Sequence, residues 1–273
     1  TVNQTTGVFA AYEKGPLMAC NCIVVVREVW DTLDLVGNVL DETGAIRPGA
    51  LQTRFEPEDL NALEAALRIK DAQGGTVTAV TVGAPRGGVE VLRECLYRGA
   101  DATLQVDADP TALDDRALAA LLAGAVRKIG AADLVLVGTS VVDGENAMLG
   151  ACLAVELGWN HVAWVDAIES AGGGKAVAKR AIEMGFESVE TPLPAVLSIG
   201  VALLEDDPRA PRSAKAMLKL KMKKAAIPTA AASDLGVSDP PALVTTRIAG
   251  RSAVPPRAVE TKTVDAENPA ELQ

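Results

Sequence analysis

Three short turns in this sequence carry the charged residues and glycines that could bind a small molecule. They occupy residues 27–31, 83–88 and 139–146, and each follows an apolar run typical of a buried strand. In an open parallel sheet, such turns lie beyond the carboxyl ends of the strands and direct backbone amides into a shared crevice. The spacing therefore predicts one binding site built from all three turns.

The third turn has residues suited to an anion site at the start of a helix. Asp143 or Asn146 could cap that helix, whose free N–H groups and dipole favour a phosphate, and Gly144 and Gly150 allow close backbone approach. Carboxylates in this turn repel a phosphate unless they point to ribose hydroxyls or to adenine. An ordinary capped helix start explains the composition equally well, so both interpretations stay open.

Alternating strand-like and helical patterns must position these turns. Apolar, β-branched runs occupy residues 22–30, 76–83, 102–107 and 133–138. Between them, apolar residues recur every three or four positions, and each helical pattern ends near a glycine; the helical patterns cover 56–75, 88–100 and 114–131. This order predicts an α/β fold with a doubly wound parallel sheet.

The pattern changes after Trp159. Residues 161–170 and 175–190 flank a glycine-rich turn and predict an antiparallel hairpin, and 194–203 returns as a buried strand. The segment that follows is rich in Asp, Pro and Lys, and the last forty or so residues have little regular pattern. We therefore divide the chain into an N-terminal extension (1–17), an α/β nucleotide-binding core (18–203), and a docking loop with a C-terminal arm (204–273).

Composition narrows the class of protein. With 49% apolar residues among 273, the chain can bury one large core. The formal net charge of −10 argues against nucleic-acid binding, which needs clustered Lys and Arg. No apolar stretch reaches the roughly 18 residues of a membrane span, and the first residues lack the pattern of a secretory signal. Four cysteines, among them the Cys20 and Cys22 pair, and the single His161 predict free thiols, no metal site and a cytoplasmic location.

Six stretches of the sequence together resemble the β subunit of electron transfer flavoprotein, part of an electron-carrying heterodimer. They cover the first strand and its turn, an acidic helix start, two nucleotide loops, a long signature and part of the arm. The matching sequences are VVVREVWD (24–31), FEPEDLNALEAALRIKD (55–71), VGAPRGGVEVLRECLYRGAD (82–101), LVGTSVVDGENAMLGACLAVELGW (136–159), AKRAIEMGFESVETPLPAVLS (178–198) and DLGV (234–237). The resemblance implies an adenine nucleotide α hydrolase-like sheet with an antiparallel hairpin and an extended C-terminal arm.

The same resemblance implies a carrier that shuttles electrons from a flavin-dependent dehydrogenase to a downstream oxidoreductase. Such a subunit has no catalytic residue of its own and pairs with an α subunit that holds most of the FAD. Ordinary members bind AMP in this subunit, and electron-bifurcating members bind a second FAD there. The residues implied to contact the nucleotide are Val25, Phe55, Glu56, Pro57, Glu58, Val82, Val142, Asp143, Gly144, Glu145, Asn146, Ala147, Met148, Leu149, Gly150, Ala151 and Cys152.

The nucleotide loop departs from the family pattern at several positions. The Asp143-Gly144 pair is closer to the bifurcating members, but Asn146 replaces their threonine, and Met148 replaces a glutamine common to both types. Glu56 replaces a usual asparagine and adds a carboxylate near the expected phosphate. We therefore rank AMP first as the bound nucleotide, FAD second, and an empty or altered pocket third.

A separate basic segment, residues 204–224, follows the core. Its lysines lie beside three apolar side chains, which would suit an arm that docks on an acidic partner, whereas composition alone favours a solvated run of charge. The resemblance implies that this loop docks the dehydrogenase, with the family's docking leucine falling on Ala214. The residues concerned are Lys215, Met217, Leu218, Lys219, Lys221, Met222, Lys223 and Lys224.

Two other classes of protein use the same kind of sheet. An adenine-nucleotide hydrolase or ligase needs a glycine- and serine-rich pyrophosphate loop after the first strand, and residues 27–31 do not provide one. A small nucleotide-binding sensor would leave the predicted hairpin and the long arm unexplained. The electron-carrier interpretation accounts for residues 27–31, for the predicted hairpin and for the long arm.

Overall fold

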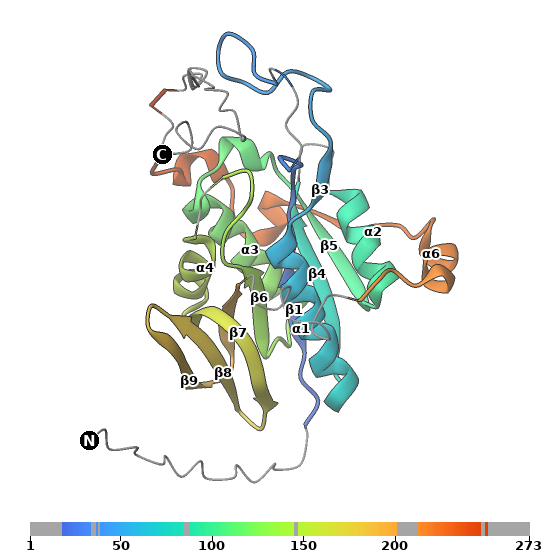
Figure 1. The fold of residues 1–273 in the computed structure, drawn as a ribbon, viewed down its shortest axis with the longest axis vertical. Helices are drawn as coiled ribbons and strands as arrows, with labels where there is room; N and C mark the ends of the chain where they lie inside the picture. Colours follow the sequence, from blue (N-terminus) through green and yellow to red (C-terminus); the bar gives the residue numbers. More distant parts are fainter. Residues whose placement is uncertain are drawn as a thin grey trace, which may run out of the picture.

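A nine-stranded, mostly parallel sheet forms the centre of the molecule (Figure 1). The computed structural model describes residues 18–33, 37, 39–83, 88–144, 147–200, 212–246 and 249–250. In spatial order the strands are β11 (Thr229–Ala231), β5 (Ala102–Asp107), β4 (Val77–Val82), β1 (Cys22–Val25), β6 (Leu134–Gly138), β10 (Ala195–Ile199), β7 (Asn160–Gly172), β8 (Lys175–Ile182) and β9 (Gly185–Pro192). Neighbours from β11 to β7 are parallel, and β7, β8 and β9 are antiparallel. The predicted fold class is confirmed.

Helices cover both faces of this sheet. Helices α1 (Pro57–Gln73) and α2 (Val89–Arg98) pack on one face, and α3 (Asp115–Ile129) and α4 (Leu149–Leu157) pack on the other. Val24 belongs to the first buried cluster and its neighbour Val25 to the second. Because successive side chains of a strand point to opposite faces, a strand covered on both sides needs apolar residues at every position.

The chain changes its direction of travel across the sheet at β1. From β1 it proceeds to β4 and β5 on one side, and it then returns to β6 on the other side. The helices that follow β1 and β6 therefore lie on opposite faces. A crevice is left beyond the carboxyl ends of these two strands, which is where doubly wound sheets bind ligands.

The first apolar run contains two strands, which corrects the prediction of a single strand over 22–30. β1 ends at Val25, and the backbone N–H of Arg27 donates to Asp59 Oδ2 at 2.8 Å instead of extending the sheet. β2 (Glu28–Trp30) then pairs antiparallel with β3 (Thr53–Phe55) in a small second sheet. A side chain from α1 thus turns the backbone away from the main sheet.

The predicted hairpin is a three-stranded antiparallel extension. Residues 175–190 turn back on themselves, so that β8 pairs with β7 on one side and with β9 on the other. The start of β7 also pairs parallel with β10, which joins the extension to the core. Figure 1 shows this extension and the short helix α6 (Ala216–Met222) at opposite sides of the molecule.

The arm contains more regular structure than its sequence predicted. β11 adds a parallel strand to β5, and the 3-10 helices η2 (Ala232–Leu235) and η3 (Pro240–Leu243) pack against α3. Asp114, the N-cap of α3, accepts the backbone N–H groups of Ala117, Thr245 and Thr246. Burial alone would raise the pKa of Asp114, but these hydrogen bonds outweigh it and hold the pKa well below its usual range. One carboxylate therefore caps the helix and fastens the arm to it.

No helix in the described ranges is long and apolar enough to cross a bilayer. Those ranges also contain no group of three His, Cys, Asp or Glu side chains arranged to bind a metal ion.

Candidate functional site

A cavity of about 200 Å³ lies at the carboxyl ends of β1 and β4. Val25, Val82 and Asp143 line it together, from the three segments that the sequence predicted to converge. Leu149, the first residue of α4, also lines it. The crevice therefore has the location and the strand ends that were expected.

Three carboxylates at the start of α1 hold the segment that forms one wall of this cavity. We call Glu56, Glu58 and Asp59 the carboxylate clasp. Glu56 Oε2 accepts the N–H of Val142 (3.0 Å), Glu58 Oε2 that of Ser140 (2.6 Å), and Asp59 Oδ1 that of Gly138 (2.8 Å). All three side chains are buried. The clasp thus binds every second amide of residues 138–142.

Arg27 supplies the positive charge behind the clasp. Its Nε and Nη2 atoms donate to the two carboxylate oxygens of Asp59 at 2.8 and 2.7 Å, and Nη2 also reaches the carbonyls of Gly138 and Ser140 at 3.0 Å each. Burial alone lowers the pKa of Arg27, but the charge and hydrogen bonds of Asp59, together with the charges of Glu56 and Glu58, more than offset this effect and the pKa is raised. The guanidinium therefore stays charged and links β1, α1 and the loop after β6.

Gly138 is required for this arrangement. A Cβ atom at residue 138 would lie 2.6 Å from Asp59 Oδ1 and 2.9 Å from Arg27 Nη2. These distances are too short for non-bonded atoms, so any side chain at this position would separate the clasp from the loop.

Glu56 is the member of the clasp whose protonation is most perturbed. Burial raises its pKa, and the negative charge of Asp59 raises it further. The N–H of Val142 and the charge of Arg27 act in the opposite direction, and the balance brings the pKa to about 7. Glu56 therefore changes charge near neutral pH, which an ordinary glutamate does not.

The acidic turn is fixed to the opposite wall of the cavity. Asp143 Oδ2 accepts the backbone N–H of Trp30 at 2.8 Å, and Trp30 and Asp143 both line the cavity. One oxygen of this carboxylate is thus used within the protein. The hydrogen bond joins the loop after β6 to β2 across the crevice.

Within the described part of the chain, the other residues predicted to contact the nucleotide do not line the cavity. Glu56 and Glu58 face the loop amides, Phe55 packs against the buried cluster on the α1 face, and Pro57 is the first residue of α1. Val142, Gly144, Ala147, Met148 and Ala151 are exposed, Gly150 is buried, and Cys152 packs partly against the cluster on the α4 face. Glu145 and Asn146 lie outside the described residues.

Several residues of the crevice were not among those predicted from the sequence. Arg27 and Trp30 were recognised only as parts of a turn, and Asp59 only as part of an acidic helix start. Thr111, Asp115, Leu118 and Leu122 reach the cavity from η1 (Pro110–Ala112) and α3. The one available signal was the combination of an arginine after the first strand with three acids at the next helix start.

The start of α4 packs closely against the sheet. His161 Nε2 and Ser198 Oγ form a 2.8 Å hydrogen bond, and a Cβ atom at Gly150 would lie 2.1 Å from that Oγ. Burial, assisted by the charge of Arg180, lowers the pKa of His161. Glycine at 150 therefore lets helix α4 approach β10 closely. The close backbone approach expected at Gly150 is thus a contact with Ser198 of the protein and not with a ligand.

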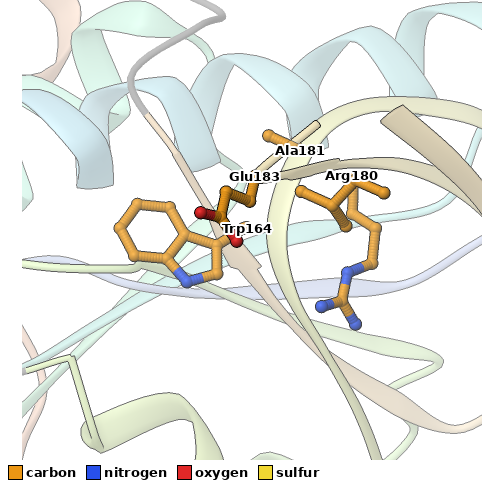
Figure 2. A pocket seen from close by; sticks show the side chains of 5 residues that line it. Trp164, Arg180, Ala181 and Glu183 are labelled. Carbon is orange, nitrogen blue, oxygen red and sulfur yellow. The ribbon is translucent and has the colours of Figure 1, made fainter. Parts of the chain in front are cut away.

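A second, open hollow of about 420 Å³ lies at the base of the antiparallel extension (Figure 2). Figure 2 shows the side chains of Trp164, Arg180 and Glu183 around it. Trp164 is 48% exposed and has φ of 58°, the only positive φ of a non-glycine residue in the described ranges. Ile182, Met184 and Phe186 are exposed on the same extension.

Helix α6 presents a separate apolar and basic surface beside α2. Met217 and Leu220 are 77% and 76% exposed and lie among the lysines of this helix. Arg212, which precedes it, is held by Glu64 at 2.9 Å and by Asp71 at 2.7 Å. The backbone N–H of Lys215 also donates to the carbonyl of Tyr97 at 2.8 Å. The arm is therefore fixed to α1 and α2 just before α6.

Comparisons with known proteins identify the family of this fold. Residues 46–235 match the electron transfer flavoprotein domain. The chain is 37% identical over 189 residues to subunit CarD of the caffeyl-CoA reductase-Etf complex of Acetobacterium woodii, covering 68% of this chain and 70% of that protein. It is 35% identical over 179 residues to the electron transfer flavoprotein β subunit of Thermoanaerobacterium thermosaccharolyticum (65% and 67% covered), and 34% identical over 225 residues to protein FixA of Azorhizobium caulinodans (80% and 77% covered).

The family match includes the clasp, Val82 and Asp143 of the crevice, and the antiparallel extension. Together with the relatives it confirms the resemblance first indicated by the sequence motifs. The chain belongs to the electron transfer flavoprotein family, as a protein of the β-subunit type.

Proposed function

We propose that this electron-transfer protein forms one half of a heterodimer, binds AMP in its own crevice, and closes one side of an FAD held mainly by an α subunit. The observation that carries the proposal is the cavity at the switch point of the sheet, where the ends of β1 and β4, the loop after β6 and the start of α4 meet. The bound flavin would supply the electron chemistry, accepting and releasing electrons. The residues of this chain bind and orient the nucleotide and the flavin, and they exclude water.

The crevice has groups suited to each part of an adenine nucleotide. Val25, Val82 and Leu118 offer apolar walls for the base. Asp143 has a second carboxylate oxygen that can accept from a ribose hydroxyl. Helix α4 begins at Leu149, and within the part of the chain that the structure describes no side chain caps its first amides, so these N–H groups can donate to a phosphate.

The antiparallel extension supports the assignment of an α partner. Ile182, Met184 and Phe186 expose apolar side chains on β8, β9 and the turn between them, beside the hollow at Trp164. Apolar surface of this kind, with charged groups around it, is typical of a protein interface. We assign this surface to the α subunit.

Counting nucleotides in the purified heterodimer tests the proposal. The chain would be co-expressed with its α subunit, the complex denatured, and the released nucleotides quantified by chromatography. We expect one FAD and one AMP per heterodimer. Two FAD molecules would instead favour a bifurcating protein, in line with the Asp143-Gly144 pair and the similarity to CarD. A single FAD without AMP would contradict the assignment of the crevice.

A pair of substitutions would connect AMP to the cavity. Val82→Trp fills the space between the strand ends and is expected to remove AMP while FAD stays at one per heterodimer. Val155→Trp is the matched control, since Val155 is 80% exposed on α4 and does not line the cavity. Equal AMP loss in both variants would show that the added indole acts through misfolding.

We further propose that residues 204–224 dock the flavin-dependent dehydrogenase through α6, and we expect Leu220→Glu to raise the KM for that dehydrogenase by about tenfold. The reason is that Leu220 is exposed between lysines, on a helix fixed to the core through Arg212. A buried apolar anchor of an interface contributes about 1–2 kcal/mol, which corresponds to roughly tenfold. Reduction of the heterodimer's flavin by the dehydrogenase would be followed spectroscopically.

The control for this docking surface is Val155→Glu, which places the same charge on an exposed apolar position of α4. It should leave the KM unchanged. If Leu220→Glu also leaves the KM unchanged, the dehydrogenase docks elsewhere.

A further inference from the structure

We call residues 138–143 the cavity wall, because Val141 and Asp143 of this segment line the cavity. The segment is held by groups from other parts of the chain. The carboxylate clasp binds the N–H groups of residues 138, 140 and 142, and the N–H of Trp30 binds Asp143. Each carboxylate therefore fixes one residue of the wall. Glu56 holds Val142, the neighbour of Asp143, so it acts closest to the acidic turn that lines the cavity.

The charges around Glu56 do not balance. Glu58 and Asp59 on α1 are acidic side chains, Arg27 after β1 is basic, and the wall contributes backbone N–H groups from Ser140 and Val142. The guanidinium is paired through two hydrogen bonds with Asp59 and does not hydrogen-bond to Glu56. Of the four ionisable side chains in this buried group, three are acids and one is a base, and Glu56 lacks a direct cationic partner among the described residues.

We infer that Glu56 is a positioning residue for the nucleotide site, which holds the cavity wall through Val142 while its carboxyl group is protonated and releases it on losing that proton to solvent. This inference rests on the proposed nucleotide site. A carboxylic acid can still accept the Val142 N–H through its carbonyl oxygen, at no cost in buried charge. Its ionised form gains hydration if the wall opens and water reaches it.

The direction of the pH effect follows from proton linkage. In the closed wall, burial raises the pKa of Glu56 to about 7, compared with 4.5 for the group in solvent. The closed form therefore binds more protons than the open form between these two values, and it loses stability as the pH rises through this range. With these values, the ratio of closed to open wall falls about tenfold between pH 6 and pH 8. Above pH 8 it changes little.

Hydrogen–deuterium exchange of the intact heterodimer tests the inference directly. The peptide covering residues 138–144 would be followed by mass spectrometry at pH 6 and pH 8, with rates corrected for intrinsic exchange. We expect its protection in the wild type to fall about tenfold between the two pH values. In Glu56→Gln, which keeps an oxygen acceptor for Val142 but cannot ionise, protection should be equal at both.

A second measurement connects the wall to the ligand. The Kd for AMP would be determined by equilibrium dialysis at the same two pH values, in wild type and in Glu56→Gln. The wild type should lose severalfold more affinity than the variant on going to pH 8, because only the wild type has an ionisable group at residue 56. The titration of the AMP phosphate affects both proteins equally and cancels in the comparison. Glu56→Ala, which removes the acceptor, should show low protection at either pH.

The matched control is Glu64→Gln, a second buried glutamate of α1, which pairs with Arg68 and Arg212 far from the cavity wall. It should retain the pH dependence of the wild type. Identical pH dependence in wild type and Glu56→Gln would overturn the inference. If the exchange behaves as expected but AMP binds to neither protein, the positioning role stands and the nucleotide assignment fails.

Discussion

Asp59→Ala lowers the free energy of unfolding of the heterodimer by about 3–5 kcal/mol, the cost of leaving a buried charge without its partner. Asp59 is fully buried and binds Arg27 through both oxygens, and it also holds the N–H of Gly138. Its removal leaves the guanidinium without its carboxylate partner and the backbone N–H groups of Arg27 and Gly138 without their acceptor. Urea denaturation followed by circular dichroism, on wild type and variant at the same protein concentration, measures this difference.

Two further variants separate the charge effect from simple loss of a side chain. Arg27→Met combined with Asp59→Ala removes both charges and should recover at least about 1 kcal/mol relative to Asp59→Ala alone. Asp71→Ala removes a carboxylate that is 61% exposed and paired with Arg212, and it should change stability by less than about 1 kcal/mol. An equally small effect at Asp59 would mean that the clasp does not hold the crevice together.

Gly150→Ala is the second substitution with a large expected effect. Its Cβ would lie 2.1 Å from Ser198 Oγ and 3.0 Å from His161 Nε2, and Ser198 is buried. Helix α4 must therefore move away from β10 or the His161–Ser198 hydrogen bond must break, at a cost of about 1–3 kcal/mol. Because α4 begins at the cavity, the content of the AMP proposed to bind there should fall with stability. Thermal unfolding and nucleotide quantification on the same preparation measure both effects.

The same site offers a rescue and a control. Ser198→Ala removes the oxygen that the new Cβ strikes, so the double variant should regain most of the lost stability. Gly144→Ala adds a Cβ whose nearest neighbour is Val141 Cγ2 at 3.7 Å, an ordinary contact, and should stay within about 0.5 kcal/mol of wild type. A similar loss in both glycine variants would point to a backbone effect unrelated to helix packing.

The core of the fold could be predicted from the sequence because its signals are local. Strands covered on both faces are apolar at nearly every position, as in residues 133–138, and the helices carry caps such as Asp114 that mark their starts. The convergence of Val25, Val82 and Asp143 followed from the general rule for parallel sheets. The family motifs agreed with the predicted sheet and with the predicted convergence of these three residues.

The parts that could not be predicted depend on contacts between distant residues. The first strand breaks because the backbone at Arg27 bonds to a side chain 32 positions later, and no local pattern shows such a bond. Glu56 and Glu58 were expected at the ligand, but a carboxylate's partner depends on the loop it meets in three dimensions. The folding of 175–190 into two strands likewise depends on pairing with β7.

The two ends of the main sheet differ in a way that bears on assembly. One end is closed by the three-residue strand β11, donated by the arm, and the other ends in β9, which has eight residues and no strand beyond it in the described chain. Short edge strands discourage pairing with another chain, whereas long ones permit it. Growth of the sheet by strand addition is therefore limited to the β9 edge, which opposes an open filament because a filament needs two usable edges on every copy.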